Sequence, residues 1–156
     1  MSNEFSTLHH ICVVVRDLEA PVAFYESDDV GPWSDFPSLE ALRNNELQVP
    51  SDDFFLLRYK FAQIDNVQLQ LCEPPEGDSP QRVFLDERGE GVFHLGFTVP
   101  NVDAAEAAQQ DNGIAVLMRG RLHDHDHSGF TYFDTADKSA GVVLEIRQSG
   151  GAGIPR

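Results

Sequence analysis

Residues 91–113 read GVFHLGFTVPNVDAAEAAQQDNG, and this stretch repeats an earlier one, HHICVVVRDLEAPVAFYES, which begins at His9. The two stretches align when His94 is placed on His10. In both copies a histidine opens an apolar segment, and seven positions later Asp17 or Asn101 supplies a residue that can cap a helix. Internal repetition of this size predicts two similar halves packed together.

The repeat predicts how the whole chain is organised. We expect an α+β fold made of two paired βαβββ modules within a single domain over residues 1–156, a length that suffices for one sizeable core. The predicted parts are a first module over 8–73, a linker with a short helix over 74–90, a second module over 91–148 and a loose tail over 149–156.

Hydrophobic alternation and capping residues predict the individual elements. Ser79, Pro80 and Gly89 predict a linker helix that starts at Pro80 and ends at Arg88. Asp17 is expected to cap the first helix, and residues 28–53 contain no clear pattern. The other expected elements are helices Leu18–Ser27 and Val102–Asn112 and strands Leu8–Val15, Phe54–Phe61, Val67–Cys72, Val92–Val99, Ala115–Arg119, Phe130–Phe133 and Val142–Arg147.

Composition and charge restrict the function. The formal net charge is −15, which argues against binding of nucleic acid or of an anionic membrane surface. The apolar runs are too short to span a membrane, and no signal-peptide pattern opens the chain. The two cysteines, Cys12 and Cys72, do not make a disulfide scaffold and are expected to be buried apolar residues, so we expect a cytoplasmic protein.

Polar residues recur at matched places in the two halves. Side chains two apart on a strand share a face, so each half presents a histidine on its first strand and an amide or carboxylate on its last. His9 is expected to face away from His10. If the halves pack about a pseudo-twofold axis, four groups suited to a divalent transition metal can converge, namely those of His10, Gln70, His94 and Glu145.

Four segments, LHHICVVVRDLEAPVAFYES, VQLQLCEP, VFHLGFTVPNVDAA and GVVLEI, resemble the vicinal oxygen chelate superfamily, the glyoxalase, bleomycin-resistance and dioxygenase group. Within it the chain looks most like methylmalonyl-CoA epimerases, whose ligand set is His, Gln, His, Glu. The resemblance implies a glyoxalase-like fold with a sheet curled around a metal cup. It also implies one divalent ion (Co, Ni, Mn, Zn or Fe) on His10, Gln70, His94 and Glu145.

The same resemblance implies an epimerase or isomerase that moves a proton beside a carbonyl group. The metal would stabilise the enolate of a small-molecule carbonyl or thioester substrate, and Glu145 would be the catalytic base. Epimerisation also needs an acid–base group on the other face of the enolate. Glu46, Asp52 and Asp53 lie in roughly the right region, but none matches the position of the second glutamate in the resembled family.

Other functions in the same superfamily remain open. An Fe(II) extradiol-type dioxygenase needs only His10, His94 and Glu145, and a glyoxalase-type lyase usually has glutamate at the position of Gln70. A small-molecule binding or resistance protein is the non-enzyme alternative, and such relatives usually lack the ligands. The retained fourth ligand favours proton chemistry.

Electrostatics bears on the substrate. A CoA thioester is a polyanion and needs a local basic patch on a protein of this charge. Candidate side chains for it are those of Arg43, Arg58, Lys60, Arg119 and Arg121. The His123–His127 segment, HDHDH, is expected to be a solvated loop instead of a metal site. A homodimer is compatible with the sequence, which leaves the oligomeric state open.

Overall fold

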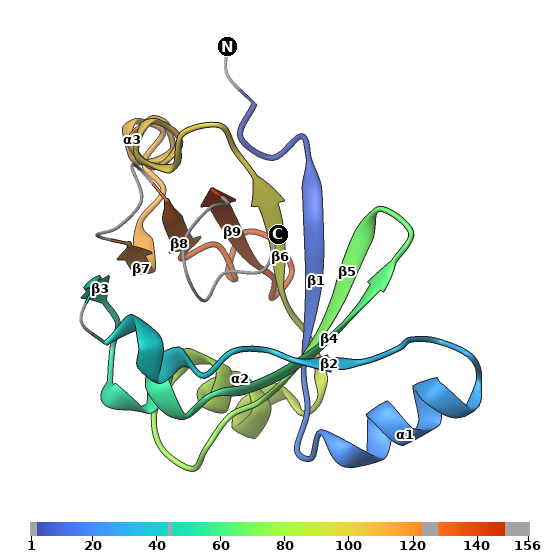
Figure 1. The fold of residues 1–156 in the computed structure, drawn as a ribbon. Coiled ribbons are helices and arrows are strands. Elements are labelled where there is room, and N and C mark those ends of the chain that lie inside the picture. Colours follow the sequence, from blue (N-terminus) through green and yellow to red (C-terminus); the bar gives the residue numbers. More distant parts are fainter. Residues whose placement is uncertain (1–2, 44, 123–127, 149–156) are drawn as a thin grey trace.

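The computed structural model describes residues 3–43, 45–122 and 128–148, so the His123–His127 segment and the tail 149–156 lie outside the described residues. In these ranges nine strands form a single sheet that curls without closing (Figure 1). The strands are β1 (Leu8–Val14), β2 (Ser34–Asp35), β3 (Glu46–Gln48), β4 (Arg58–Ile64), β5 (Val67–Glu73), β6 (Gly91–Thr98), β7 (Val116–Arg121), β8 (Gly129–Phe133) and β9 (Val143–Gln148). The helices are α1 (Glu19–Ser27), α2 (Pro80–Arg88) and α3 (Val102–Asp111), with short 3-10 helices η1 (Leu39–Leu42) and η2 (Asp52–Leu56).

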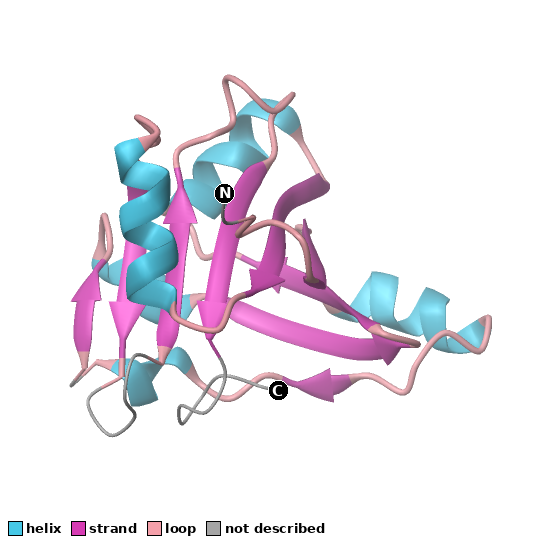
Figure 2. Cartoon of the chain, turned by 90° about the horizontal axis from the view of Figure 1, so that it is seen from above, coloured by secondary structure: helices cyan, strands magenta, loops and turns pink. Residues whose placement is uncertain are grey.

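The strand order is β2-β4-β5-β1-β6-β9-β8-β7-β3. The first strands of the two repeats, β1 and β6, are antiparallel neighbours, and each has the last strand of its own repeat, β5 or β9, parallel on its other side. Helix α3 packs on β8 and β9, while α2 lies against β1 and β6 (Figure 2). The expected α+β class with a curled sheet is confirmed.

The register between β1 and β6 relates the two sequence repeats to each other by symmetry. Ile11 pairs with Leu95, which is also its equivalent in the repeat, and the pairs His10–Gly96 and Cys12–His94 flank it on either side. A local pseudo-twofold axis therefore passes through the Ile11–Leu95 pair. It places His10 and His94 on one face of the sheet, because both are one residue away from this pair.

Some local expectations were wrong. Phe54 does not begin a strand, because Ser51 accepts a hydrogen bond from the amide of Asp53 and starts η2 instead, so β4 begins only at Arg58. Asp17 does not cap α1 either; Leu18 is the N-cap, and the Asp17 carboxylate binds the Glu19 amide. Helix α2 has the expected bounds.

The segment without a clear sequence pattern contains β2, η1 and β3. Strand β3 pairs with β7, so Leu47 of the first repeat lies opposite Gly120 of the second. This pairing extends the sheet at the β7 edge with residues from the other repeat. Cys12 and Cys72 are fully buried, as expected. Over the described ranges, no helix has both the length and the hydropathy needed to span a bilayer.

A buried ionic network attaches α3 to the sheet. One carboxylate oxygen of Glu106 accepts hydrogen bonds from Arg119 Nε (2.9 Å), Arg121 Nη2 (2.7 Å) and Thr131 Oγ1 (2.5 Å). Glu106 is 9% exposed and Arg121 is 8% exposed, so water screens these charges poorly. The network therefore depends on the carboxylate at its centre.

We expect Glu106→Gln to lower the free energy of unfolding by about 3 kcal/mol, because buried guanidinium groups lose their charged partner. Urea denaturation followed by circular dichroism measures this. The control is Glu26→Gln, a matched change at an exposed position of α1, which should shift stability by less than about 0.5 kcal/mol. Equal effects of the two substitutions would contradict the structural role of Glu106.

Candidate functional site

Three side chains from three adjacent strands meet on the concave side of the sheet. His10 Nε2 on β1 lies 2.9 Å from His94 Nε2 on β6 and 2.8 Å from Glu145 Oε2 on β9. His94 Nε2 is 3.0 Å from the same carboxylate oxygen. All three residues are buried, with exposures of 3%, 0% and 4%. Each of these three polar atoms therefore faces the other two.

Gly96 explains how these side chains can reach each other. It lies on β6 between His10 on β1 and Glu145 on β9, directly opposite both. Because glycine has no side chain, the imidazole of His10 occupies the space above its Cα, and a Cβ at residue 96 would overlap the ring. His10, Gly96 and Glu145 thus lie side by side on three adjacent strands, and the imidazole reaches the carboxylate across the glycine.

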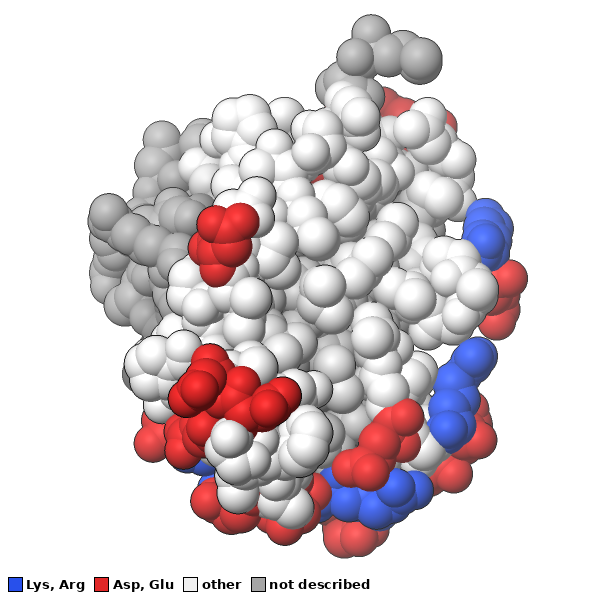
Figure 3. Space-filling model, turned by 90° about the vertical axis from the view of Figure 1, so that its right-hand side faces the viewer, with Lys and Arg blue, Asp and Glu red and all other residues white. Residues whose placement is uncertain are grey.

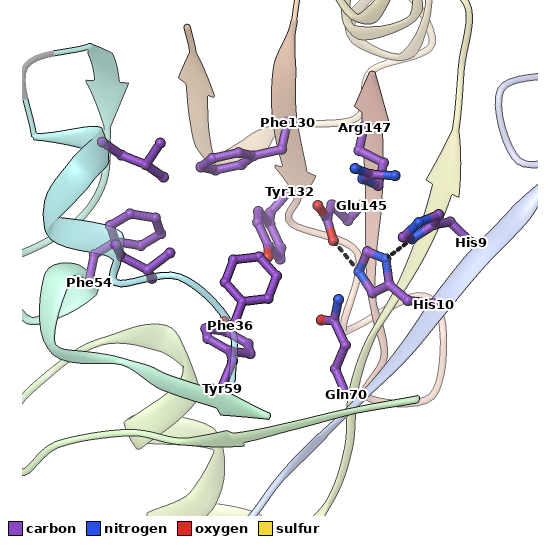
Figure 4. A pocket seen from close by; sticks show the side chains of 12 residues that line it. His9, His10, Phe36, Phe54, Tyr59, Gln70, Phe130, Tyr132, Glu145 and Arg147 are labelled. Atoms are coloured by element: carbon purple, nitrogen blue, oxygen red, sulfur yellow. Dashed lines mark hydrogen bonds and ion pairs between the residues drawn. The ribbon is translucent and has the colours of Figure 1, made fainter. Parts of the chain in front are cut away.

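Gln70 occupies the equivalent position to Glu145 in the other repeat. It lies opposite Cys12 on β1, just as Glu145 lies opposite Gly96, the equivalent of Cys12, on β6. Its side chain lines the same pocket as His10 and Glu145 (Figure 4). The amide nitrogen donates a hydrogen bond of 2.6 Å to Gln68 Oε1, so the oxygen is the atom of this side chain that could bind a metal ion.

The pocket has a polar wall and an apolar wall (Figure 4). The polar wall contains His9, His10, Gln70, Glu145 and Arg147. The rest of the lining is aromatic and aliphatic. Phe130 and Tyr132 lie beside Arg147 and Glu145 on the neighbouring strand β8, and the other members are Phe36, Leu39, Leu42, Phe54 and Tyr59. A ligand with one polar end and one apolar end matches this division.

Burial and mutual contact set the protonation of the cluster. Burial lowers the pKa of His94, against the opposing effect of the Glu145 carboxylate, so His94 is neutral at neutral pH. Burial alone would raise the pKa of Glu145, but the facing imidazoles of His10 and His94 outweigh it and hold that pKa well below its usual range. A neutral imidazole and an ionised carboxylate are the forms that bind metal ions.

The donor set fits a divalent transition metal. Ligand atoms about 2.1 Å from a metal ion and at right angles to each other are about 3 Å apart, close to the separations found among His10, His94 and Glu145. Imidazole nitrogen with carboxylate oxygen suits Zn, Fe, Ni, Co or Mn. The buried Nδ1 of His94 has no hydrogen-bond partner, so interactions at Nε2 hold this ring.

His9 does not face away from the site, and that expectation was wrong. Its Nδ1 lies 2.8 Å from Nδ1 of His10, and the side chain lines the pocket. The cause is a β-bulge, because Leu8 lies opposite Phe97 and His10 opposite Gly96, which leaves His9 as the extra residue on β1. Alternation of side chains fails at a bulge, and the sequence carries no signal for this one.

Arg147 is the buried cation of the pocket, with 3% exposure. A signal for it was present, since it lies two residues after Glu145 on the same face of the strand. The five basic residues considered as a patch lie elsewhere and contact carboxylates, in the pairs Arg43–Glu40, Arg58–Glu73, Lys60–Asp35, Arg119–Glu106 and Arg121–Glu106. On the face in Figure 3 basic side chains likewise lie beside acidic ones.

The three carboxylates considered as a second acid–base group do not line the pocket. Glu46 contacts Arg119, Asp52 lies 3.9 Å from Arg43, and Asp53 accepts a hydrogen bond from the amide of Asp78. In the pocket lining formed by the described residues, Glu145 is the one carboxylate. Any acid–base partner of Glu145 in this lining is therefore not a carboxylate.

Known proteins resemble this chain in sequence. The model of the family described as Glyoxalase/Bleomycin resistance protein/Dioxygenase superfamily matches residues 9–133. The uncharacterized protein YqjC of Bacillus subtilis is 25% identical over 91 residues, which are 58% of this chain and 64% of YqjC. The chain thus spans less than two thirds of that relative. Mitochondrial methylmalonyl-CoA epimerase of Homo sapiens is 24% identical over 143 residues, 91% of this chain and 73% of the relative.

Solved structures resemble the fold. A structure of methylmalonyl-CoA epimerase in complex with methylmalonyl-CoA and NH4+ is 27% identical and superposes with a TM-score of 0.65. The match covers 97% of this chain and 99% of that one. The likeness therefore extends over the whole curled sheet, including all three strands that carry His10, His94 and Glu145.

We expect Gly96→Ala to weaken metal binding by at least about tenfold, because the new Cβ displaces the imidazole of His10. Cobalt titration followed by visible absorption measures the affinity. Gly91→Ala is the matched control on the same strand, since a Cβ at residue 91 meets nothing within 4 Å. Unchanged affinity in Gly96→Ala, with the fold retained, would show that His10 is not a ligand.

Proposed function

Because this chain belongs to the Glyoxalase/Bleomycin resistance protein/Dioxygenase superfamily, we propose that it is a metal-dependent epimerase or isomerase that moves a proton beside a carbonyl group. The convergence of His10, His94 and Glu145 beside the pocket, which His10 and Glu145 line, carries this proposal. These three residues and Gln70 would hold one divalent ion, Co, Ni, Mn, Zn or Fe. When bound, the ion supplies positive charge that favours the enolate form of a carbonyl compound.

Glu145 is the proposed base. Its pKa lies well below the usual range, which keeps the carboxylate ionised but makes it a weak base. This carboxylate could accept a proton from the carbon beside the carbonyl because the positive charge of a bound ion would acidify that carbon. Tyr59 and Tyr132 also belong to the pocket lining, and burial raises the pKa of both phenols well above its usual value. Both phenols remain protonated at neutral pH, and we assign to one of them the return of a proton to the enolate. The phenolate that this leaves and the protonated Glu145 would return to their starting forms by exchanging protons with solvent.

The proposed substrate is a small carbonyl compound or an acyl thioester. The similarity to a methylmalonyl-CoA epimerase that binds methylmalonyl-CoA supports the thioester. The apolar wall formed around Phe54 and Phe130 would contact the acyl part. Arg147 supplies local positive charge to a pocket in a protein whose net charge is −15, which favours an anionic substrate there.

A ring-cleaving Fe(II) dioxygenase is the second candidate. Two histidines and one carboxylate are sufficient for such a site, and His10, His94 and Glu145 are the residues in mutual contact. The amide nitrogen of Gln70 is held by Gln68, and the oxygen of Gln70 is needed only in the epimerase proposal. Gln70 therefore separates the two candidates experimentally.

We expect the purified protein to bind close to one divalent ion per chain and to exchange a substrate proton beside a carbonyl for solvent deuterium without consuming oxygen. Metal analysis, NMR detection of deuterium and an oxygen electrode measure these three quantities, after reconstitution with cobalt, nickel, manganese, zinc or iron. Methylmalonyl-CoA is the first substrate to test. His94→Ala should lose both the metal and the exchange.

Two outcomes would overturn the proposal. Oxygen consumption that requires iron, with no deuterium incorporation, would favour the dioxygenase. Failure to bind any of these ions would remove the metal centre and leave a binding pocket. Within the epimerase proposal, Gln70→Ala should reduce metal affinity, whereas in the dioxygenase candidate it should leave affinity unchanged.

A further inference from the structure

His9 and His10 form a contact that the proposed reaction does not use. The two Nδ1 atoms are 2.8 Å apart, and the rings are nearly perpendicular, with an interplanar angle of 87°. At this distance one nitrogen must donate a proton and the other must accept it. The direction of that hydrogen bond fixes which nitrogen of His10 carries its own proton.

Metal binding by His10 requires one of the two directions. The Nε2 atom of His10 faces His94 and Glu145, so its lone pair must point toward them for His10 to act as a ligand. The proton of a neutral His10 is then on Nδ1, and a buried N–H without an acceptor is costly. His9 Nδ1 lies in position to accept it.

The other histidine of the site lacks such a neighbour. The pairing of Cys12 with His94 and of Val13 with Val92 leaves Phe93 as the extra residue of a second bulge, on β6. Phe93 is the equivalent of His9 in the repeat, 84 residues later, and offers a ring edge to His94 but no polar atom. The Nδ1 atom of His94 accordingly has no hydrogen-bond partner.

We propose that His9 is a positioning residue for the metal ligand His10. Its Nδ1 accepts the Nδ1 proton of His10 and so keeps the lone pair of Nε2 directed at His94 and Glu145. The bulge is the structural device that allows this, because it turns His9 to the side of the strand on which His10 lies. The inference rests on the metal site of the proposed function and adds a residue outside the expected ligand set.

The test compares His9→Asn with His9→Leu. The two new side chains have nearly the same shape, but only asparagine offers an acceptor atom at the place of Nδ1. We expect His9→Leu to weaken cobalt binding by about 10- to 100-fold, as for other substitutions that remove the hydrogen-bond partner of a ligating histidine. His9→Asn should retain an affinity close to that of the unsubstituted protein.

A second measurement reports on His10 directly. Imidazole NMR signals of the zinc-loaded protein, in which the ion would replace a proton at Nε2, report on the hydrogen bond at Nδ1 of His10. We expect a slowly exchanging, downfield-shifted Nδ1 proton on His10 in the unsubstituted protein and in His9→Asn, and the loss of that downfield shift in His9→Leu. Phe93→Leu, at the equivalent bulge, is the control for loss of packing and should leave the His10 signals unchanged.

The outcomes separate this inference from the proposed function. If the unsubstituted protein binds cobalt and His9→Leu binds it equally well with unchanged His10 signals, His9 is not a positioning residue, and the metal site stands. If His9→Asn is as impaired as His9→Leu, the hydrogen bond is not what matters, and the inference also fails. If the unsubstituted protein binds no metal, the proposed function fails, and the inference fails with it because His10 is then no ligand.

Discussion

The antiparallel pairing of β1 with β6 is the constraint on which the site depends. Its centre, the Ile11–Leu95 pair, joins two equivalent residues of the repeat and defines the pseudo-twofold axis. A histidine lies one residue before Ile11 and one residue before Leu95, so the pairing alone places the two imidazoles on the same face of the sheet. Strands β5 and β9 then add Gln70 and Glu145 at equivalent positions on either side.

The polar groups of the candidate site depend on the positions at which the two repeats differ. Glu145 occupies the position that Gln70 has in the other repeat. The site therefore contains one carboxylate and one amide, whereas identical repeats would give two carboxylates or two amides. Gly96 stands where the other repeat has Cys12, and the missing side chain lets His10 reach the carboxylate. His9 and Phe93 likewise replace each other at the two bulges. A symmetric scaffold thus holds an asymmetric set of groups.

The sequence predicted what local periodicity and repetition control. The paired modules, helix α2 and the convergence of His10, His94 and Glu145 follow from two-residue alternation and from the alignment of the repeats, although ligation by these residues is still a proposal. The contact of His9 with His10 could not be predicted, because a bulge depends on register between strands. Strand β3 was missed for a similar reason, since its partner β7 is far away in the sequence.

The two repeats also differ in the length of one connection. Residues 36–57 join β2 to β4, whereas residues 122–128 make the corresponding join between β7 and β8. The longer connection contains β3 and contributes Leu39, Leu42 and Phe54 to the apolar wall of the pocket. The histidines and the carboxylate lie on the repeated strands. Changes confined to this one connection can therefore alter the apolar lining of the pocket, and with it the range of ligands that fit, while the duplicated strands and their polar cluster stay intact.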